Sequence, residues 1–116
     1  MTVKLLVLRS GEDIVADVQE MVVNEKVVGY YLDCPHRAKL ITEKSKDGTT
    51  TYRSRVQLLP WIPLSKDRNI PVVADWIISM VEPIDTLKEL FEDRLEQINE
   101  SQSDSDAEQS YLVDPD

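Results

Sequence analysis

Cys34 and His36 are the only cysteine and the only histidine of this 116-residue chain, and a single proline separates them. A thiol and an imidazole at this spacing could ligate a metal ion together with Asp33, but a metal site needs about four ligands. They could also form a nucleophile and its base, but that chemistry needs a cleft and a third group that orients the imidazole. The sequence shows neither requirement, so we interpret the pair as a core thiol beside an exposed loop histidine.

The other residues that could act in catalysis also form no recognisable catalytic pattern. Asp13 and Asp17 share one face of a predicted strand, and without a partner acid in a pocket they are typical of solvent-side residues. The chain has no glycine-rich phosphate loop and no zinc signature. We therefore predict that the protein is not an enzyme and that it uses neither a cofactor nor a metal.

Length and composition bound the class of protein. A chain of 116 residues supports one domain with a modest core. The single cysteine excludes an internal disulfide and fits a reducing compartment. No signal-peptide pattern is present, and no apolar run approaches the roughly 20 residues of a membrane-spanning helix. We expect a cytoplasmic protein without a membrane partner.

The net charge of −9 is concentrated at the C-terminal end, because residues 1–83 carry 11 basic and 11 acidic side chains. Within the neutral part, residues 37–55 have an excess of four positive charges. The nucleic-acid candidates are Arg37, Lys39, Lys44, Lys46, Arg53 and Arg55. This segment could contact phosphates, form a solvated hairpin flank, or bind the acidic tail of this chain or of a neighbour.

Aromatic residues offer a second route to nucleic-acid binding. As on other small barrels that bind single strands, they could act as platforms for base stacking. The alternative is that they lie in the core or at a subunit contact. The residues concerned are Tyr30, Tyr31, Tyr52, Trp61 and Trp76.

Alternating apolar and polar residues predict strands throughout residues 1–83. Turn signals at regular spacing are typical of a small barrel or sandwich, and a change of phase near Met21 indicates a bent strand. We expect an all-β, five-stranded, strongly bent barrel. Its strands lie at residues 3–9, 12–23, 27–34, 49–59 and 70–81. Pro35 interrupts pairing after the third strand, and residues 38–42 continue in a new direction.

The C-terminal residues follow a different pattern. Apolar side chains recur at intervals of three and four from Ile84 to Ile98, which predicts an amphipathic helix over residues 84–100 that ends near Asn99. Its apolar stripe consists of Ile84, Leu87, Phe91, Leu95 and Ile98. Residues 101–116 form an acidic tail in which Tyr111–Val113 is the only apolar anchor.

Two segments of the chain resemble the Sm-like family. Gly11 lies in a turn and is followed by hydrophobic, small and hydrophobic residues at the spacing of the family's first motif: Ile14, Ala16 and Val18. The final strand, VVADWIISMVEP, is similar in length and apolar character to the second motif, and five strands agree with the Sm barrel. The chain resembles in particular the Sm-like group encoded by marine cyanophages, over about residues 3–34 and 70–82.

The chain also departs from that family. Members that bind RNA have an Asp/aromatic/Met-Asn cluster after the first motif, where this chain reads MVVNEK with only Asn24 in common. Their second motif has an Arg-Gly turn, which is replaced by Ala74-Asp75, and their N-terminal helix is missing because strand pattern begins by Val3. The resemblance therefore implies a ring-forming barrel, and the family's uridine pocket does not carry over.

An open barrel leaves two strand edges that tend to pair with another copy. Head-to-tail pairing that closes gives a cyclic ring, so we expect a homo-oligomer of roughly five to seven subunits. The resemblance to phage proteins implies the cytoplasm of an infected bacterial host.

Two functions fit these expectations. One is a ring associated with single-stranded RNA in phage RNA metabolism, which the resemblance and the basic hairpin favour. The other is a structural or adaptor ring that binds proteins and has no nucleic-acid activity, which the missing RNA residues, the helix stripe and the acidic tail favour. We prefer the first, because the family resemblance weighs more than the tail.

Overall fold

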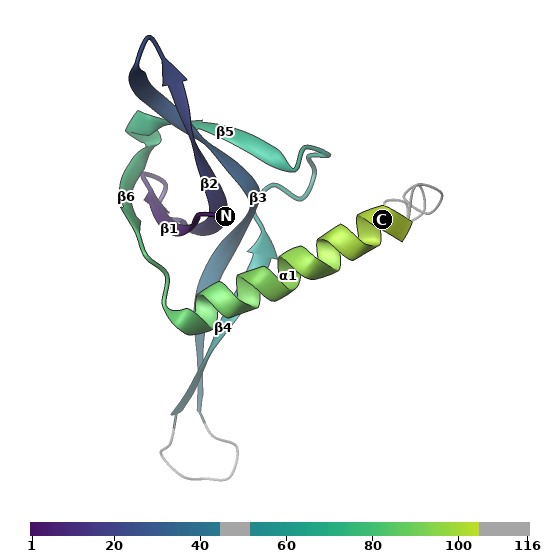
Figure 1. The fold of residues 1–116 in the computed structure, drawn as a ribbon. Coiled ribbons are helices and arrows are strands. Elements are labelled where there is room, and N and C mark those ends of the chain that lie inside the picture. Colours follow the sequence, from purple (N-terminus) through teal and green to yellow (C-terminus); the bar gives the residue numbers. More distant parts are fainter. Residues whose placement is uncertain (45–51, 105–116) are drawn as a thin grey trace.

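The computed structural model describes residues 1–44 and 52–104, which form six strands and one α-helix (Figure 1). The strands are β1 (Val3–Leu8), β2 (Asp13–Val23), β3 (Lys26–Lys44), β4 (Tyr52–Pro60), β5 (Asn69–Val73) and β6 (Ile77–Val81). A 3-10 turn, η1 (Ala74–Trp76), joins β5 to β6, and α1 (Asp85–Asp104) follows β6.

The strands form one bent antiparallel sheet in the order β4-β3-β2-β1-β6, and β5 pairs with β3 beside that path. β5 and β6 are consecutive parts of one segment, and they pair with β3 and β1 respectively. The pairing therefore runs from β1 through β2 and β3 to this segment and back to β1. The result is a small barrel-like fold with a C-terminal helix, as the sequence predicts at this level (Figure 1).

The predicted strand at residues 70–81 is two strands, so the expected count of five is wrong for the described residues. The first half of this segment pairs with β3 and its second half pairs with β1. The chain changes direction at Ala74–Trp76, where the Arg9 N–H donates to the Trp76 carbonyl at 2.9 Å. The side chain of Arg9 also donates to the carbonyl of Asp75.

β3 continues through Pro35, but its pairing changes there. Asp17 lies opposite Asp33 and Val15 lies opposite His36, so two residues of β3 face the single Ala16. This β-bulge places Cys34 at φ 51° and leaves proline, which has no N–H, outside the regular ladder. On its other edge β3 changes partner at the same point, from β5 to β4. The predicted interruption of pairing is present, although the strand does not end.

Two hydrophobic clusters lie on opposite faces of β1 and β2. The curved sheet encloses one of them: Leu6, Leu8, Ile14, Ala16, Leu32 and Val72. The other joins the sheet to α1: Val3, Val15, Cys34, Leu58, Leu87, Phe91 and Leu95. Because successive side chains of a strand point to opposite faces, β1 contributes to both clusters. β1 is therefore packed on both of its faces.

The predicted apolar stripe packs against the sheet except at Ile84, which precedes α1. Leu87, Phe91 and Leu95 are buried, Ile98 packs at the edge of the cluster, and Ile84 is 65% exposed. The helix continues to Asp104 instead of ending near Asn99. Residues 101–104 contain neither glycine nor proline, so no local signal ends the helix there. The remainder of the predicted acidic tail, residues 105–116, lies outside the described residues.

Candidate nucleic-acid interface and a cavity at the β3 bulge

The β3–β4 hairpin brings four of the predicted basic residues to one face. Residues directly opposite each other in an antiparallel pair share a face of the sheet. Arg37 lies opposite Leu59, Lys39 opposite Gln57, Ile41 opposite Arg55, and Glu43 opposite Arg53. We call the face that carries Arg37, Lys39, Arg53 and Arg55 the basic face.

The other two candidates are not on the basic face as the structure describes it. Lys44 pairs with Tyr52, and its position in the strand alternation places it on the opposite face of the hairpin. Lys46 lies outside the described residues. Sequence spacing assigns a basic residue to one face of the hairpin or the other only when the alternation of the strand is known.

Acidic side chains partly neutralise the basic face. Glu12 Oε2 lies 3.6 Å from Arg37 Nε, and Glu43 Oε1 lies 3.5 Å from Arg55 Nη2. These side chains are partly exposed, and ion pairs of this kind contribute about 0–1 kcal/mol. Within the described residues, Lys39 and Arg53 are exposed and have no acidic partner. The face therefore keeps a positive excess.

A cavity of about 460 Å³ separates the turn between β1 and β2 from the start of the basic face. Arg37 and Lys39 line it, but so do Glu12 and Asp13. Two cations and two carboxylates in one cavity do not favour a phosphate. Contacts with a nucleic-acid backbone would instead fall on the exposed strands.

A second cavity, of about 290 Å³, lies at the bulge of β3, and we call it the bulge cavity. Its walls come from the loop after β4 and from the C-terminal half of α1. Most of them are apolar, and they include Pro60, Trp61, Ile62, Ile70 and Ile98. Cys34 and His36 also line the cavity. Backbone hydrogen bonds hold the loop here, from Trp61 N–H to Pro35 O at 3.1 Å and from Cys34 N–H to Arg68 O at 2.8 Å.

His36 is buried inside β3, so the prediction of an exposed loop histidine is wrong. Only 4% of the residue is exposed, and its ring meets Phe91 edge-on with centroids 6.2 Å apart. The Nδ1–H group donates a hydrogen bond of 2.8 Å to the Cys34 carbonyl. Burial lowers the pKa of His36, and the positive charge of Arg94 acts in the same direction. The ring is therefore neutral near pH 7.

Cys34 is the core thiol that the sequence predicts, because only 7% of the residue is exposed. Burial, followed by the negative charge of Asp33, raises the pKa of Cys34 to about 11. The thiolate is the nucleophilic form of cysteine, and it is scarce at neutral pH with such a pKa. Within the described residues, no group of three or more His, Cys, Asp or Glu side chains is placed to hold a metal ion.

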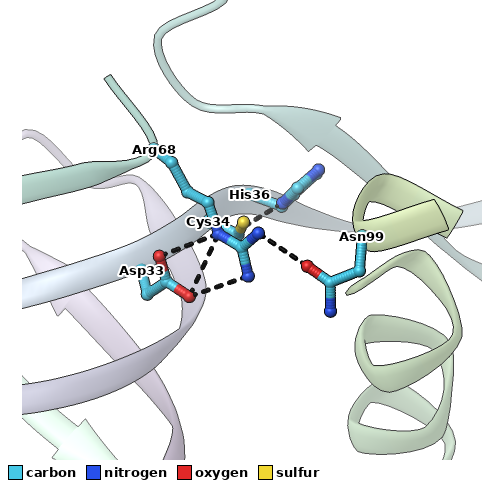
Figure 2. Close-up of polar contacts among 5 residues, drawn as sticks. All are labelled: Asp33, Cys34, His36, Arg68 and Asn99. Atoms are coloured by element: carbon cyan, nitrogen blue, oxygen red, sulfur yellow. Dashed lines mark hydrogen bonds and ion pairs between the residues drawn. The ribbon is translucent and has the colours of Figure 1, made fainter. Parts of the chain in front are cut away.

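Arg68 links three elements beside the bulge (Figure 2). Its Nε donates to Asp33 Oδ1 at 3.0 Å, its Nη2 donates to Asp33 Oδ2 at 3.2 Å, and its Nη1 donates to Asn99 Oδ1 at 2.6 Å. The hydrogen bond to Asp33 is the main cause that raises the pKa of Arg68. The sequence analysis missed this residue, and its place directly before a strand was the only available signal.

Some of the candidate aromatic residues are packed against the core, and others are exposed as base stacking would require. Trp61 is half-buried and packs beside the barrel interior with Tyr30, and its indole N–H donates to Glu12 Oε1 at 3.3 Å. Trp76 and Tyr31 are exposed by 44% and 36% respectively. The side chain of Tyr52 is not among those the structure describes. Trp61 lies beside the start of the basic face, because Glu12 accepts from its indole and also lies 3.6 Å from Arg37 Nε.

In comparisons with known proteins, the sequence matches no family model and no curated protein. The Sm-like resemblance therefore stays a prediction from the sequence. Across residues 1–44 and 52–104, none of the helical structure is long and apolar enough to cross a bilayer.

Proposed function

We propose that the protein is a ring-forming, Sm-like protein that associates with single-stranded RNA through the basic face. The observation that carries the proposal is the register of β3 and β4, which gathers Arg37, Lys39, Arg53 and Arg55 on one side of the hairpin.

The spacing on this face suits a phosphate backbone. Residues two apart in a strand are about 6.6 Å apart, so Arg53 and Arg55 present cations at a regular repeat. Arg37 and Lys39 do the same on the neighbouring strand. Cations in such an array bind phosphates without reading base sequence, and the affinity falls steeply as salt is added.

The ends of the sheet support assembly into a ring. β4 and β6 are the terminal strands of the sheet order, and each has one edge without a partner among the described strands. β6 exposes Ile78 by 66% and Val81 by 43%, and it contains no charged residue that would oppose pairing. In the proposed ring the β6 edge of one copy pairs with the β4 edge of the next, and each subunit repeats the basic face.

A protein-binding adaptor is the second candidate, and the acidic neighbours favour it. Glu12 and Glu43 each lie beside an arginine of the basic face, where they compete with phosphates. Trp61, which shares Glu12 with Arg37, is half-buried and offers little surface for stacked bases, so the proposed RNA affinity depends mainly on charge.

Fluorescence anisotropy of a labelled single-stranded RNA tests the proposal. The double substitution Arg53→Glu, Arg55→Glu should abolish binding at low salt, and added salt should weaken the binding of the parent protein steeply. Lys44→Glu is the control on the opposite face of the same hairpin, and because it reverses one charge where the double variant reverses two, Arg53→Glu alone is its matched comparison. If the control loses as much affinity as the double variant, or if the parent does not bind at low salt, the adaptor function replaces this proposal.

A further inference from the structure

His36 presents an acceptor without a donor in the bulge cavity. A carbonyl oxygen only accepts, so the hydrogen bond to Cys34 requires the proton on Nδ1 and leaves a lone pair on Nε2 of the neutral ring. No donor to Nε2 is found in the described part of the chain, although the residue is only 4% exposed. Figure 2 shows the ring directed away from the Arg68–Asp33 pair. No side-chain nitrogen or oxygen of the described residues is both fully buried and unpaired, so Nε2 is accessible from the cavity that His36 lines and can accept a hydrogen bond from a ligand that brings a donor.

The rest of the cavity selects the shape of that ligand. Trp61, Ile62, Ile70 and Ile98 provide apolar walls around the imidazole. A volume of about 290 Å³ lies at the lower limit for small-molecule sites, which suits a single large side chain better than a cofactor. The combination favours an apolar ring that ends in a hydroxyl, which is the chemistry of tyrosine.

The chain supplies such a side chain close to the cavity. Beyond Ile98, Tyr111–Val113 is the only cluster of large apolar residues in the sequence. The α1 helix ends at Asp104, about 9 Å along the helix axis from Ile98. Seven further residues reach up to about 25 Å, so Tyr111 can return to the cavity that Ile98 lines. Lys66, an exposed residue of the cavity lining, offers a cation to the carboxylate of Asp114, which follows the cluster directly.

We propose that the bulge cavity binds Tyr111–Val113 of the same chain, and that the Tyr111 hydroxyl donates a hydrogen bond to His36 Nε2. This interaction covers the apolar cavity with the C-terminal segment. It requires neither RNA binding nor ring formation, so the failure of either proposal leaves the other standing.

Fluorescence of Trp61 tests the interaction in the full-length chain. The substitution Trp76→Phe leaves Trp61 as the single tryptophan, in the wall of the cavity. In this background Tyr111→Ala should shift the Trp61 emission to the red and increase its quenching by acrylamide. Tyr111→Phe keeps the ring and removes the hydroxyl, so its effect should be intermediate. Ser110→Ala is the control and should leave emission and quenching unchanged.

Nuclear Overhauser effects provide the second measurement, on the chain without the Trp76→Phe substitution. We expect cross-peaks between the Tyr111 ring protons and the methyl groups of Ile98. In a sample that mixes isotope-labelled and unlabelled chains, isotope filtering should show that these contacts lie within one chain. Contacts found only between chains would overturn the assignment to the same chain.

Two fluorescence results would also count against the proposal. Unchanged quenching in Tyr111→Ala would exclude the segment from the cavity. If Tyr111→Phe has the same emission and quenching as the parent, the Tyr111 hydroxyl does not donate to His36.

Discussion

At residue scale, the proline between Cys34 and His36 determines the environment of both side chains. The sequence pattern treats Pro35 as the end of a strand, which places His36 in a loop. The β-bulge instead accommodates the missing N–H, so β3 continues and His36 stays in the sheet. Burial of Cys34 was predictable from its place in an alternating strand, whereas burial of His36 depends on Phe91, which is 55 residues away in the sequence.

This burial predicts how stability depends on pH. The folded pKa of His36 is below its ordinary value of 6.5, so the unfolded chain binds more protons than the folded chain in mildly acidic solution. Stability therefore rises with pH, and the contribution is lost as pH falls from 6.5 toward the lowered folded pKa. The slope from one such group is at most about 1.4 kcal/mol per pH unit. Urea unfolding at several pH values between about 5.5 and 7.5 measures it.

His36→Asn is the control for this pH dependence. The asparagine amide nitrogen is bonded to Cγ as Nδ1 is, so it can still donate to the Cys34 carbonyl, but it does not titrate. Its free energy of unfolding should depend less on pH than that of the parent over the same range. Equal slopes in the two proteins would contradict the assignment to His36.

At the scale of elements, the sequence predicted the helix better than the last strand. The stripe from Leu87 to Leu95 has the helical period, and packing of one face against the sheet follows from that period alone. The break at Ala74–Trp76 has no local signal such as glycine or proline. It follows from the requirement that one segment reach both β3 and β1, which is a property of the closed topology.

Packing of α1 on the sheet gives a prediction for Phe91, which is completely buried. Phe91→Ala leaves a cavity between the helix and the sheet and should lower the free energy of unfolding by about 3–5 kcal/mol. Ile84→Ala, on an exposed side chain of the same apolar series, should change it by less than about 0.5 kcal/mol. Chemical denaturation of both variants checks the difference, and similar values would show that the helix does not pack as described.

The candidate sites differ in how far the sequence predicts them. The basic face follows from the turn signal near residue 48 and the strand phase, because pairing across a hairpin is local. The bulge cavity could not be predicted, since Cys34, Trp61, Arg68 and Ile98 come from four separate segments. Only the three-dimensional fold places these residues together.

At the scale of the whole molecule, two features limit how copies can associate. The sheet ends in β4, whose exposed Arg53 and Arg55 oppose random pairing, and in β6, which has no charged residue. Charged residues protect the edge of a strand, and an apolar edge without them favours pairing. We therefore expect the proposed self-association to depend most on the β6 edge.

A pair of matched substitutions tests this view of assembly. Ile78 in β6 and Ile84 before α1 are exposed by 66% and 65% respectively. Substitution by lysine therefore removes a similar area of exposed apolar surface at each site. Light scattering coupled to gel filtration should give a mass several times 13.3 kDa for the parent. Ile78→Lys should reduce it to that of a single chain, because a charge at the β6 edge opposes pairing. Ile84→Lys should keep the mass of the assembly, and a parent that is monomeric at micromolar concentration would exclude the ring.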